Sequence, residues 1–189
     1  MTIVQVMADN NRDEVIVRTT ERAEIAELLA PFDIHLEQWP TRGLAADATQ
    51  DEIFAAYRGE IDDVCAAGGY QLVDVVRMVP DPENAEWRTR AAGARTKFLD
   101  EHRHAENEVR FFVEGRGCFY LHLGDKVYAV VCVEGDLISV PAGTTHWFDM
   151  GATPQFCAIR FFEQEDGWIG DFTGDPISAR MPSLDELLG

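Results

Sequence analysis

Short apolar runs alternate with turns throughout the second half of the chain. Six runs rich in Val, Ile, Phe and Tyr are separated by Gly, Pro or Asp, at residues 108–115, 117–126, 127–136, 137–143, 145–150 and 155–164. Such runs predict short strands, and many short strands with frequent turns are typical of an antiparallel barrel or a double-sheet jelly roll. Gly124 and Asp125 predict a tight hairpin. We expect Gly115 and Gly117 to turn the chain back as well.

The first hundred residues mix helical and strand patterns. Thr20 is the expected N-cap of a helix over residues 21–32, in which Ile25, Leu28 and Leu29 share one face. Thr49-x-x-Glu52 is a capping box that predicts a second helix to about Cys65, ended by Gly68-Gly69. A third helix is predicted at residues 84–101, and strands at 3–7, 14–18, 32–40 and 70–79. The predicted class is therefore mainly β, with the N-terminal helices packed outside the barrel.

Length and charge limit the classes of protein that this chain can be. Its 189 residues fit a single domain, 1–189, with a barrel core at about residues 98–163, followed by a tail that lacks regular structure and packs along the barrel. The formal charge of −18, from 34 acidic and 16 basic residues, argues against nucleic acid or an anionic membrane as a partner. Four cysteines without a CxxC motif indicate a reducing, cytoplasmic setting. We also predict a monomer.

Metal-binding chemistry is concentrated in two segments. His102, His104 and Glu108 form an H-x-H-x3-E pattern, and His146 follows 38 positions after Glu108. Residues 102, 104 and 108 have the same parity, so one extended segment could point all three donors into one cavity. Imidazoles with a carboxylate suit Fe, Ni, Co, Mn or Zn. Three of the five histidines in the chain fall in these segments, which favours a metal site over chance.

Other residues are interpreted from their place in the pattern. His35 and His122 stand alone and are expected to be partly buried or at the surface. Arg110 shares the parity of Glu108, and an inward-pointing arginine is costly unless it meets an anion; the alternative is a structural salt bridge with a barrel carboxylate. Phe148 likewise shares the parity of His146.

The two metal segments resemble the two motifs of the cupin superfamily, whose small double-stranded β-helix barrels hold a metal at the barrel mouth. More narrowly, the segments EHRHAENEVRFFVEGRGCF, PAGTTHWFDMG and GWIGDFTGD are similar to the acireductone dioxygenase family of the methionine salvage pathway. The resemblance covers about residues 70–175. Position 150 is Met, which is the form of this family, whereas the generic cupin motif ends in Asn. Asn107 stands where the family typically has Asp.

The resemblance implies specific roles for nine residues. His102, His104, Glu108 and His146 would bind one Fe(II) or Ni(II), with Co(II) or Mn(II) as further metals. Arg110 and Arg160 would lie near the substrate oxygens, and Phe98, Phe148 and Trp168 would form apolar walls. For Phe98 and Trp168, ordinary core packing is an equal alternative.

The resemblance also implies a reaction between acireductone, an acyclic ene-diol ketone, and O2. With Fe(II) the products would be 2-keto-4-methylthiobutanoate and formate. With Ni(II) or Co(II) they would be 3-(methylthio)propanoate, formate and CO. Two alternatives are another metal-cupin enzyme, such as an isomerase or a diketone-type dioxygenase, and a cupin that binds a small ligand without turnover.

Overall fold

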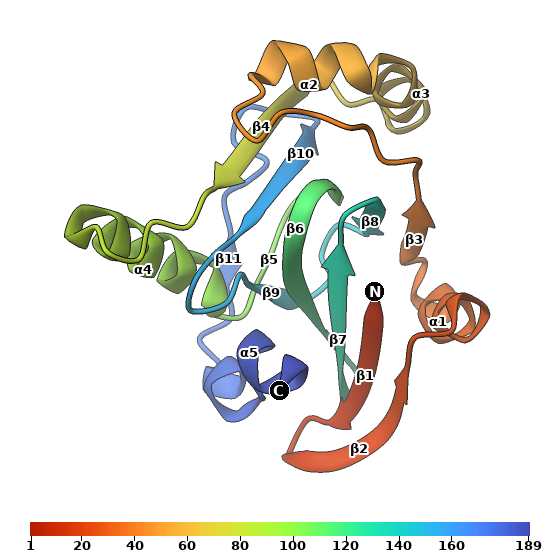
Figure 1. Cartoon of the computed structure of the whole chain (residues 1–189). Helices are drawn as coiled ribbons and strands as arrows, with labels where there is room; N and C mark the ends of the chain where they lie inside the picture. Colours follow the sequence, from red (N-terminus) through yellow and green to blue (C-terminus); the bar gives the residue numbers. More distant parts are fainter.

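Two antiparallel β-sheets that share one long strand form the centre of the molecule (Figure 1). The structure is a computed structural model that describes all 189 residues. One sheet has the order β11-β5-β9-β6-β7-β1-β2, and the other runs β4-β10-β6-β8-β3. The strands are β1 (Ile3–Ala8), β2 (Asn11–Thr19), β3 (His35–Gln38), β4 (Leu72–Met78), β5 (His102–Arg103), β6 (Glu108–Leu123), β7 (Lys126–Val133), β8 (Asp136–Val140), β9 (His146–Asp149), β10 (Phe156–Phe162) and β11 (Asp171–Phe172). The predicted mainly-β class is confirmed.

Strand β6 passes through both sheets because it carries a β-bulge. The expectation that Gly115 and Gly117 turn the chain back is wrong, since β6 continues for 16 residues. Cys157 of β10 pairs with Glu114 while Ala158 pairs with Phe112, so Val113 has no partner, and Gly115 has a φ of 72°. A bulge adds one residue and bends the strand. The bend lets the first half of β6 pair with β8 and β10 and the second half with β7 and β9. The predicted hairpin at Gly124, between β6 and β7, is present.

Helices lie around the outside of the sheets (Figure 1). They are α1 (Arg22–Leu29), η1 (Ala30–Phe32), α2 (Gln50–Ala56), α3 (Arg58–Gly68), α4 (Ala85–Leu99), η2 (Pro176–Arg180) and α5 (Leu184–Leu188). None of them is long and apolar enough to cross a membrane.

Three details of the helices differ from the sequence-based expectations. Thr20 does not cap α1, whose N-cap is Glu21 without a side-chain bond. The capping box at Thr49 is present, but the helix that it opens breaks at Tyr57 into α2 and α3. The tail is not irregular, because it contains β11, η2 and α5.

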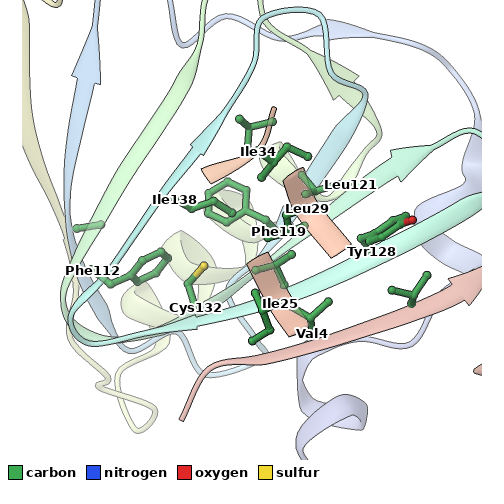
Figure 2. Packing of buried hydrophobic residues seen from close by; sticks show 14 of the residues in the cluster. Val4, Ile25, Leu29, Ile34, Phe112, Phe119, Leu121, Tyr128, Cys132 and Ile138 are labelled. Carbon is green, nitrogen blue, oxygen red and sulfur yellow. The ribbon is translucent and has the colours of Figure 1, made fainter. Parts of the chain in front are cut away.

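Apolar residues form three buried clusters, one between the sheets and one on each outer face. In the cluster between the sheets, Ile25 and Leu29 of α1 pack towards Phe119 and Ile138 (Figure 2). On the outer face of the β4-β10-β6 sheet, Tyr57 contacts Phe111, with 4.8 Å between the ring centroids. The third cluster is described next, since it involves the tail.

The tail covers the outer face of the other sheet. Leu184 and Leu187 of α5 belong to a buried cluster with Trp147 and Tyr120, whose rings stack 5.0 Å apart. The tail therefore packs along the barrel as expected, although it does so through helices. With both outer faces covered, the open region left for a ligand is the space between the sheets.

Candidate metal centre

His102, Glu108 and His146 lie on neighbouring strands at one end of the space between the sheets, and His104 lies in the connection between β5 and β6. His102 of β5 pairs directly with His146 of β9, and His146 also pairs with Leu121 of β6. The chain bends after His104 and re-enters a sheet at Glu108, so the expectation of a single extended segment is wrong. The donors converge because three neighbouring strands, β5, β6 and β9, and the bend after His104 bring them together.

Hydrogen bonds join the two segments that carry these donors. The Gly143 N–H donates to the carbonyl oxygen of His104 at 2.9 Å, and the Ala142 N–H donates to Asn107 Oδ1 at 2.9 Å. The turn that precedes His146 is thus bonded to the bend that precedes Glu108. These two bonds set the spacing between the two segments without involving the donor atoms themselves.

Backbone carbonyl groups fix the tautomer of all three histidines. The Nδ1 atoms of His102, His104 and His146 lie 2.7, 3.0 and 2.8 Å from the carbonyl oxygens of Asp100, Ile169 and Thr144. A carbonyl oxygen only accepts, so each Nδ1–H must donate, and in the neutral ring each Nε2 keeps its lone pair. This outer arrangement is typical of histidines that bind a metal.

The imidazole nitrogens of the three histidines lie close together, as the ligands of a bound cation would. The three histidines offer ligand atoms within 4.8 Å of one another, and all three side chains are buried. Nε2 of His146 is buried without any hydrogen-bond partner. Nε2 of His104 lies 3.0 Å from Oε2 of Glu108, where two lone pairs would repel without a proton or a metal ion between them. The four residues therefore fit a divalent metal with imidazole and carboxylate ligands.

Burial and charge keep most of these donors ready to bind a metal at neutral pH. Burial lowers the pKa of His146 to about 4 and also lowers the pKa of His102. Burial opposes the ionisation of Glu108, but the Arg110 charge and the bond with His104 hold the pKa of Glu108 well below its usual range. The pKa of His104 is raised, because its bond with Glu108 outweighs its burial. Three of the four donors are thus held in the unprotonated form that a metal requires.

Arg110 points into the same cavity, as its parity predicts, and its charge has a partner. Its Nη2 atom lies 3.0 Å from Glu108 Oε1, while the other oxygen of Glu108 faces His104 and His146. The alternative prediction for Arg110, a structural salt bridge with a barrel carboxylate, is therefore present. The carboxylate is that of Glu108, which is also a predicted metal ligand. Glu108 can therefore offer one oxygen to a metal and the other to Arg110.

Arg160 lies beside Arg110 and is neutralised by a different carboxylate. β10 pairs Arg160 with Arg110 on one side and with Asp74 of β4 on the other. Arg160 holds Asp74 through two bonds of 2.7 and 2.5 Å, and both guanidinium groups lie over the ring of Phe162. Arg110 is almost fully buried, whereas Arg160 lies nearer the surface. The two arginines thus line the inner and outer parts of the same cavity.

All nine residues singled out in the sequence line this one cavity. Eleven of its 17 lining residues are hydrophobic, and the other six are the four predicted metal ligands with Arg110 and Arg160. The sequence reading missed several wall residues, among them Val76, Phe156 and Ala158. The sequence could have predicted two of them, because Phe156 and Ala158 lie at even separations from Arg160 on one strand and therefore share its face.

The aromatic walls are positioned by particular contacts. A Cβ atom on Gly117 would come within 2.3 Å of the Phe148 ring, so the glycine makes room for that ring. Trp168 is 40% exposed at the cavity mouth, with Lys97 Nζ 3.9 Å from its ring centroid and 5.3 Å from that of Phe98. Trp168 therefore lies at the mouth of the cavity, whereas Phe98 lines the cavity and also packs, partly buried, against the cluster between the sheets.

The remaining histidines and the cysteines lie apart from the cavity. His35 is exposed beside Asp33. His122 is partly buried between Glu101 and Asp9, at 2.6 and 3.5 Å. The four cysteines are free thiols, and three of them are buried.

Three inward imidazoles and a carboxylate at the end of a double-stranded β-barrel define a metal-binding cupin. Within that class, the chain belongs to the ARD/ARD' family, whose model matches residues 3–170. The acireductone dioxygenase resemblance read from the sequence is thereby confirmed.

Full-length relatives agree with this assignment. The chain is 71% identical to acireductone dioxygenase 1 of Nocardia farcinica (strain IFM 10152) over 189 residues, covering 100% of both chains. It is 57% identical to acireductone dioxygenase 2 of the same strain over 188 residues, covering 100% of this chain and 98% of the relative.

A solved structure has the same fold. It is described as the acireductone dioxygenase from Bacillus anthracis with a cadmium ion in its active center. Its TM-score is 0.74 at 27% identity, covering 91% of this chain and 98% of that one. The predicted cupin fold is therefore confirmed, and this neighbour holds a metal ion.

Proposed function

We propose that this protein is a metal-dependent dioxygenase that cleaves acireductone with O2. The observation that carries the proposal is the arrangement of Glu108, whose carboxylate faces His104 and His146 on one side and Arg110 on the other. This arrangement places a cation site directly beside a buried positive side chain. A substrate that binds as an anion would meet both.

The proposed ligands are His102, His104, Glu108 and His146, and the proposed metal is one Fe(II) or Ni(II), with Co(II) or Mn(II) as further metals. A bound divalent ion would act as a Lewis acid that favours the deprotonated ene-diol. Arg110 would stabilise the negative charge of the bound substrate, because its guanidinium lies in a buried setting where charges interact strongly. Arg160 would do so from the outer part of the cavity.

The aromatic walls would bind the rest of the substrate. Phe98, Phe148 and Trp168, with the other apolar residues of the cavity, would take up the methylthio end and keep water away from the reacting atoms. Every polar residue of the cavity is either a proposed metal ligand or one of the two arginines, and the other lining residues are apolar. This composition supports acireductone over a sugar phosphate as the substrate. A sugar-phosphate isomerase would need further cationic side chains, and the cavity has only these two arginines.

Several finer features belong to the proposal. The chain would act as a monomer and as one cupin domain, 1–189, with the metal-binding core at about residues 98–163. Its free thiols fit the cytoplasm. Fe(II) would give 2-keto-4-methylthiobutanoate and formate, and Ni(II) or Co(II) would give 3-(methylthio)propanoate, formate and CO.

The test is reconstitution of one polypeptide with two metals. The chain is stripped with a chelator, loaded separately with Fe(II) and with Ni(II), and mixed with acireductone under O2 while oxygen uptake and products are measured. Uptake of O2 with the two product sets is the expected result. If both metals bind and neither preparation consumes O2, the dioxygenase proposal fails and a binding function without turnover takes its place.

A further inference from the structure

Residues 101–106, which include the proposed ligands His102 and His104, also form hydrogen bonds with the residues that follow β10. Residues 163–173, which we term the closing segment, run from the end of β10 through β11 and include Trp168. Nδ1–H of His104 donates to the carbonyl oxygen of Ile169, and the Thr173 N–H donates to the carbonyl oxygen of Glu101 at 3.1 Å. A third attachment is made by Glu106, which binds the first residues of the closing segment.

Glu106 is a buried carboxylate that binds the start of the closing segment. Its side chain lies only two residues from His104 and from Glu108, yet it does not line the metal cavity. Oε2 of Glu106 accepts from the backbone N–H groups of Glu163 at 2.6 Å and Gln164 at 3.3 Å. Glu106 as a whole is 8% exposed. A carboxylate that accepts two backbone N–H groups in a buried place holds the turn strongly.

The other oxygen of Glu106 is pressed against Gly167. Oε1 is buried without a hydrogen-bond partner, and a Cβ atom on Gly167 would stand 1.0 Å from it. Leaving a buried carboxylate oxygen without a hydrogen-bond partner costs stability. The arrangement requires glycine at position 167, next to Trp168.

The turn held by Glu106 leads directly into the cavity wall. The Gly167 N–H donates to the Gln164 carbonyl at 3.2 Å, and the Ile169 N–H donates to the Asp166 carbonyl at 2.9 Å. These bonds connect the two amides that Glu106 binds to the backbone on either side of Trp168. The Trp168 side chain is 40% exposed, and Lys97 Nζ lies over its ring.

We propose that Glu106 is a positioning residue for substrate binding, whose carboxylate fixes the turn at residues 163–167 and so holds Trp168 across the mouth of the metal cavity. This inference rests on the proposed function, because it takes the cavity to be the acireductone site. Without the carboxylate, two backbone N–H groups lose their acceptor and the Trp168 wall moves away from the mouth. The substrate then binds more weakly, while the metal ligands keep their places.

Three substitutions test this, with one matched control. Glu106→Ala removes the acceptor, and Gly167→Ala displaces the same carboxylate from the opposite side. Glu106→Gln removes the charge but keeps a carbonyl oxygen that can accept both N–H groups. Glu165→Ala is the control, because Glu165 is an exposed carboxylate of the same turn. Each metal-loaded protein is assayed for metal content, for amide hydrogen exchange at residues 163–169, and for kcat and KM with acireductone.

The Ala variants at positions 106 and 167 should exchange the amides of residues 163–169 about tenfold faster and raise KM about tenfold, with kcat within about threefold of the parent. Glu106→Gln and Glu165→Ala should stay within about threefold in both measurements. Gly167→Ala leaves residue 106 intact. It therefore still tests whether the Glu106 carboxylate positions the turn if Glu106→Ala does not fold or does not bind metal.

Several results would overturn the proposal. Unchanged exchange in both Ala variants would show that Glu106 does not hold the turn, and faster exchange with an unchanged KM would show that the turn does not serve the substrate. A Gln variant that matches the Ala variant in KM while keeping slow exchange would assign Glu106 a purely electrostatic role. Failure of the proposed function is a distinct result: the parent would not consume acireductone, and the exchange rates alone would then decide whether Glu106 positions the turn.

Discussion

Arg95 of α4 forms a salt bridge with two hydrogen bonds to Asp149 of β9. Nε donates to Oδ1 at 2.8 Å and Nη2 donates to Oδ2 at 3.0 Å. Asp149 is almost completely buried and also accepts from the backbone N–H groups of Gly151 and Leu184. One carboxylate therefore joins α4, the strand that carries His146, and the C-terminal helix α5.

Replacing Arg95 with Ala should lower the free energy of unfolding by about 2 kcal/mol. The change leaves a buried carboxylate with only its two backbone donors, and a hydrogen bond to a charged group contributes about that amount. Urea unfolding of the two proteins measures the difference. Arg90→Ala, an exposed change on the same helix, is the control and should shift stability by less than about 0.5 kcal/mol. Equal midpoints for Arg95→Ala and the parent would contradict the prediction.

The same carboxylate predicts a pH dependence of stability. Burial raises the pKa of Asp149, but bonds with Arg95, Leu184 and Gly151 outweigh burial and lower it below its usual value of 3.8. Because the pKa is lower in the folded state, the stabilisation is complete above the unfolded pKa and is lost as the pH falls through the folded pKa. Relative to Asp149→Asn, the stability advantage of the metal-free parent should be constant above about pH 5 and shrink below about pH 4. An advantage that grows on acidification would refute this sign.

Replacing His146 with Ala should abolish tight metal binding. The change removes the one Nε2 atom that is buried with no other partner, and with it one of the proposed donors. Elemental analysis after dialysis should find less than about a tenth of the parental metal content. His35→Ala, which alters an exposed histidine away from the cavity, should retain it. Near-stoichiometric metal in His146→Ala would overturn the ligand assignment.

A methyl group at position 170 should weaken metal binding without removing any donor. A Cβ atom on Gly170 would lie 3.1 Å from Cδ2 of the His102 ring, so the imidazole would have to shift. Disturbing groups that orient a ligand costs about tenfold or more in affinity. Competition titration with Ni(II) measures the dissociation constant of Gly170→Ala. Gly93→Ala, at an α4 position with open space around its Cβ, is the control. Equal constants for Gly170→Ala and the parent would show that the His102 ring is not confined there.

Replacing Arg110 with Ala should leave the metal bound but lower kcat/KM about 100-fold, which corresponds to about 2.7 kcal/mol. The reason is that Arg110 contacts Glu108 and faces the cavity, whereas it offers no donor to a metal. Steady-state oxygen uptake and metal analysis are made on the same preparation. Arg116→Ala, an exposed change on the same strand, should keep full activity. A loss of less than about threefold in Arg110→Ala would remove Arg110 from the mechanism.

Local patterns in the sequence were enough to predict the class of fold, and the resemblance to a known family predicted the residues around the site. Alternating apolar runs and turn residues predict short antiparallel strands, because side chains alternate between the two faces of a strand. Within one strand, the shared parity of Glu108 and Arg110 predicts that both face the same cavity, whereas His102 and His104 reach it from a separate strand and a bend. Strand pairing then brings these residues to the same end of the barrel.

Tertiary structure decided what no local pattern encodes. The bulge at Val113 lets β6 run through Gly115 and changes which residues face inward, because one unpaired residue reverses the parity of all that follow. The bend after His104 depends on bonds from a turn 35 residues away, and Arg160 finds Asp74 only because β4 pairs with β10. The role of Glu106 likewise depends on a turn nearly sixty residues later in the chain. The sequence by itself thus determined which donors and strands the protein has, while long-range pairing determined their partners, since the energy of a buried charge depends on neighbours that are distant along the chain.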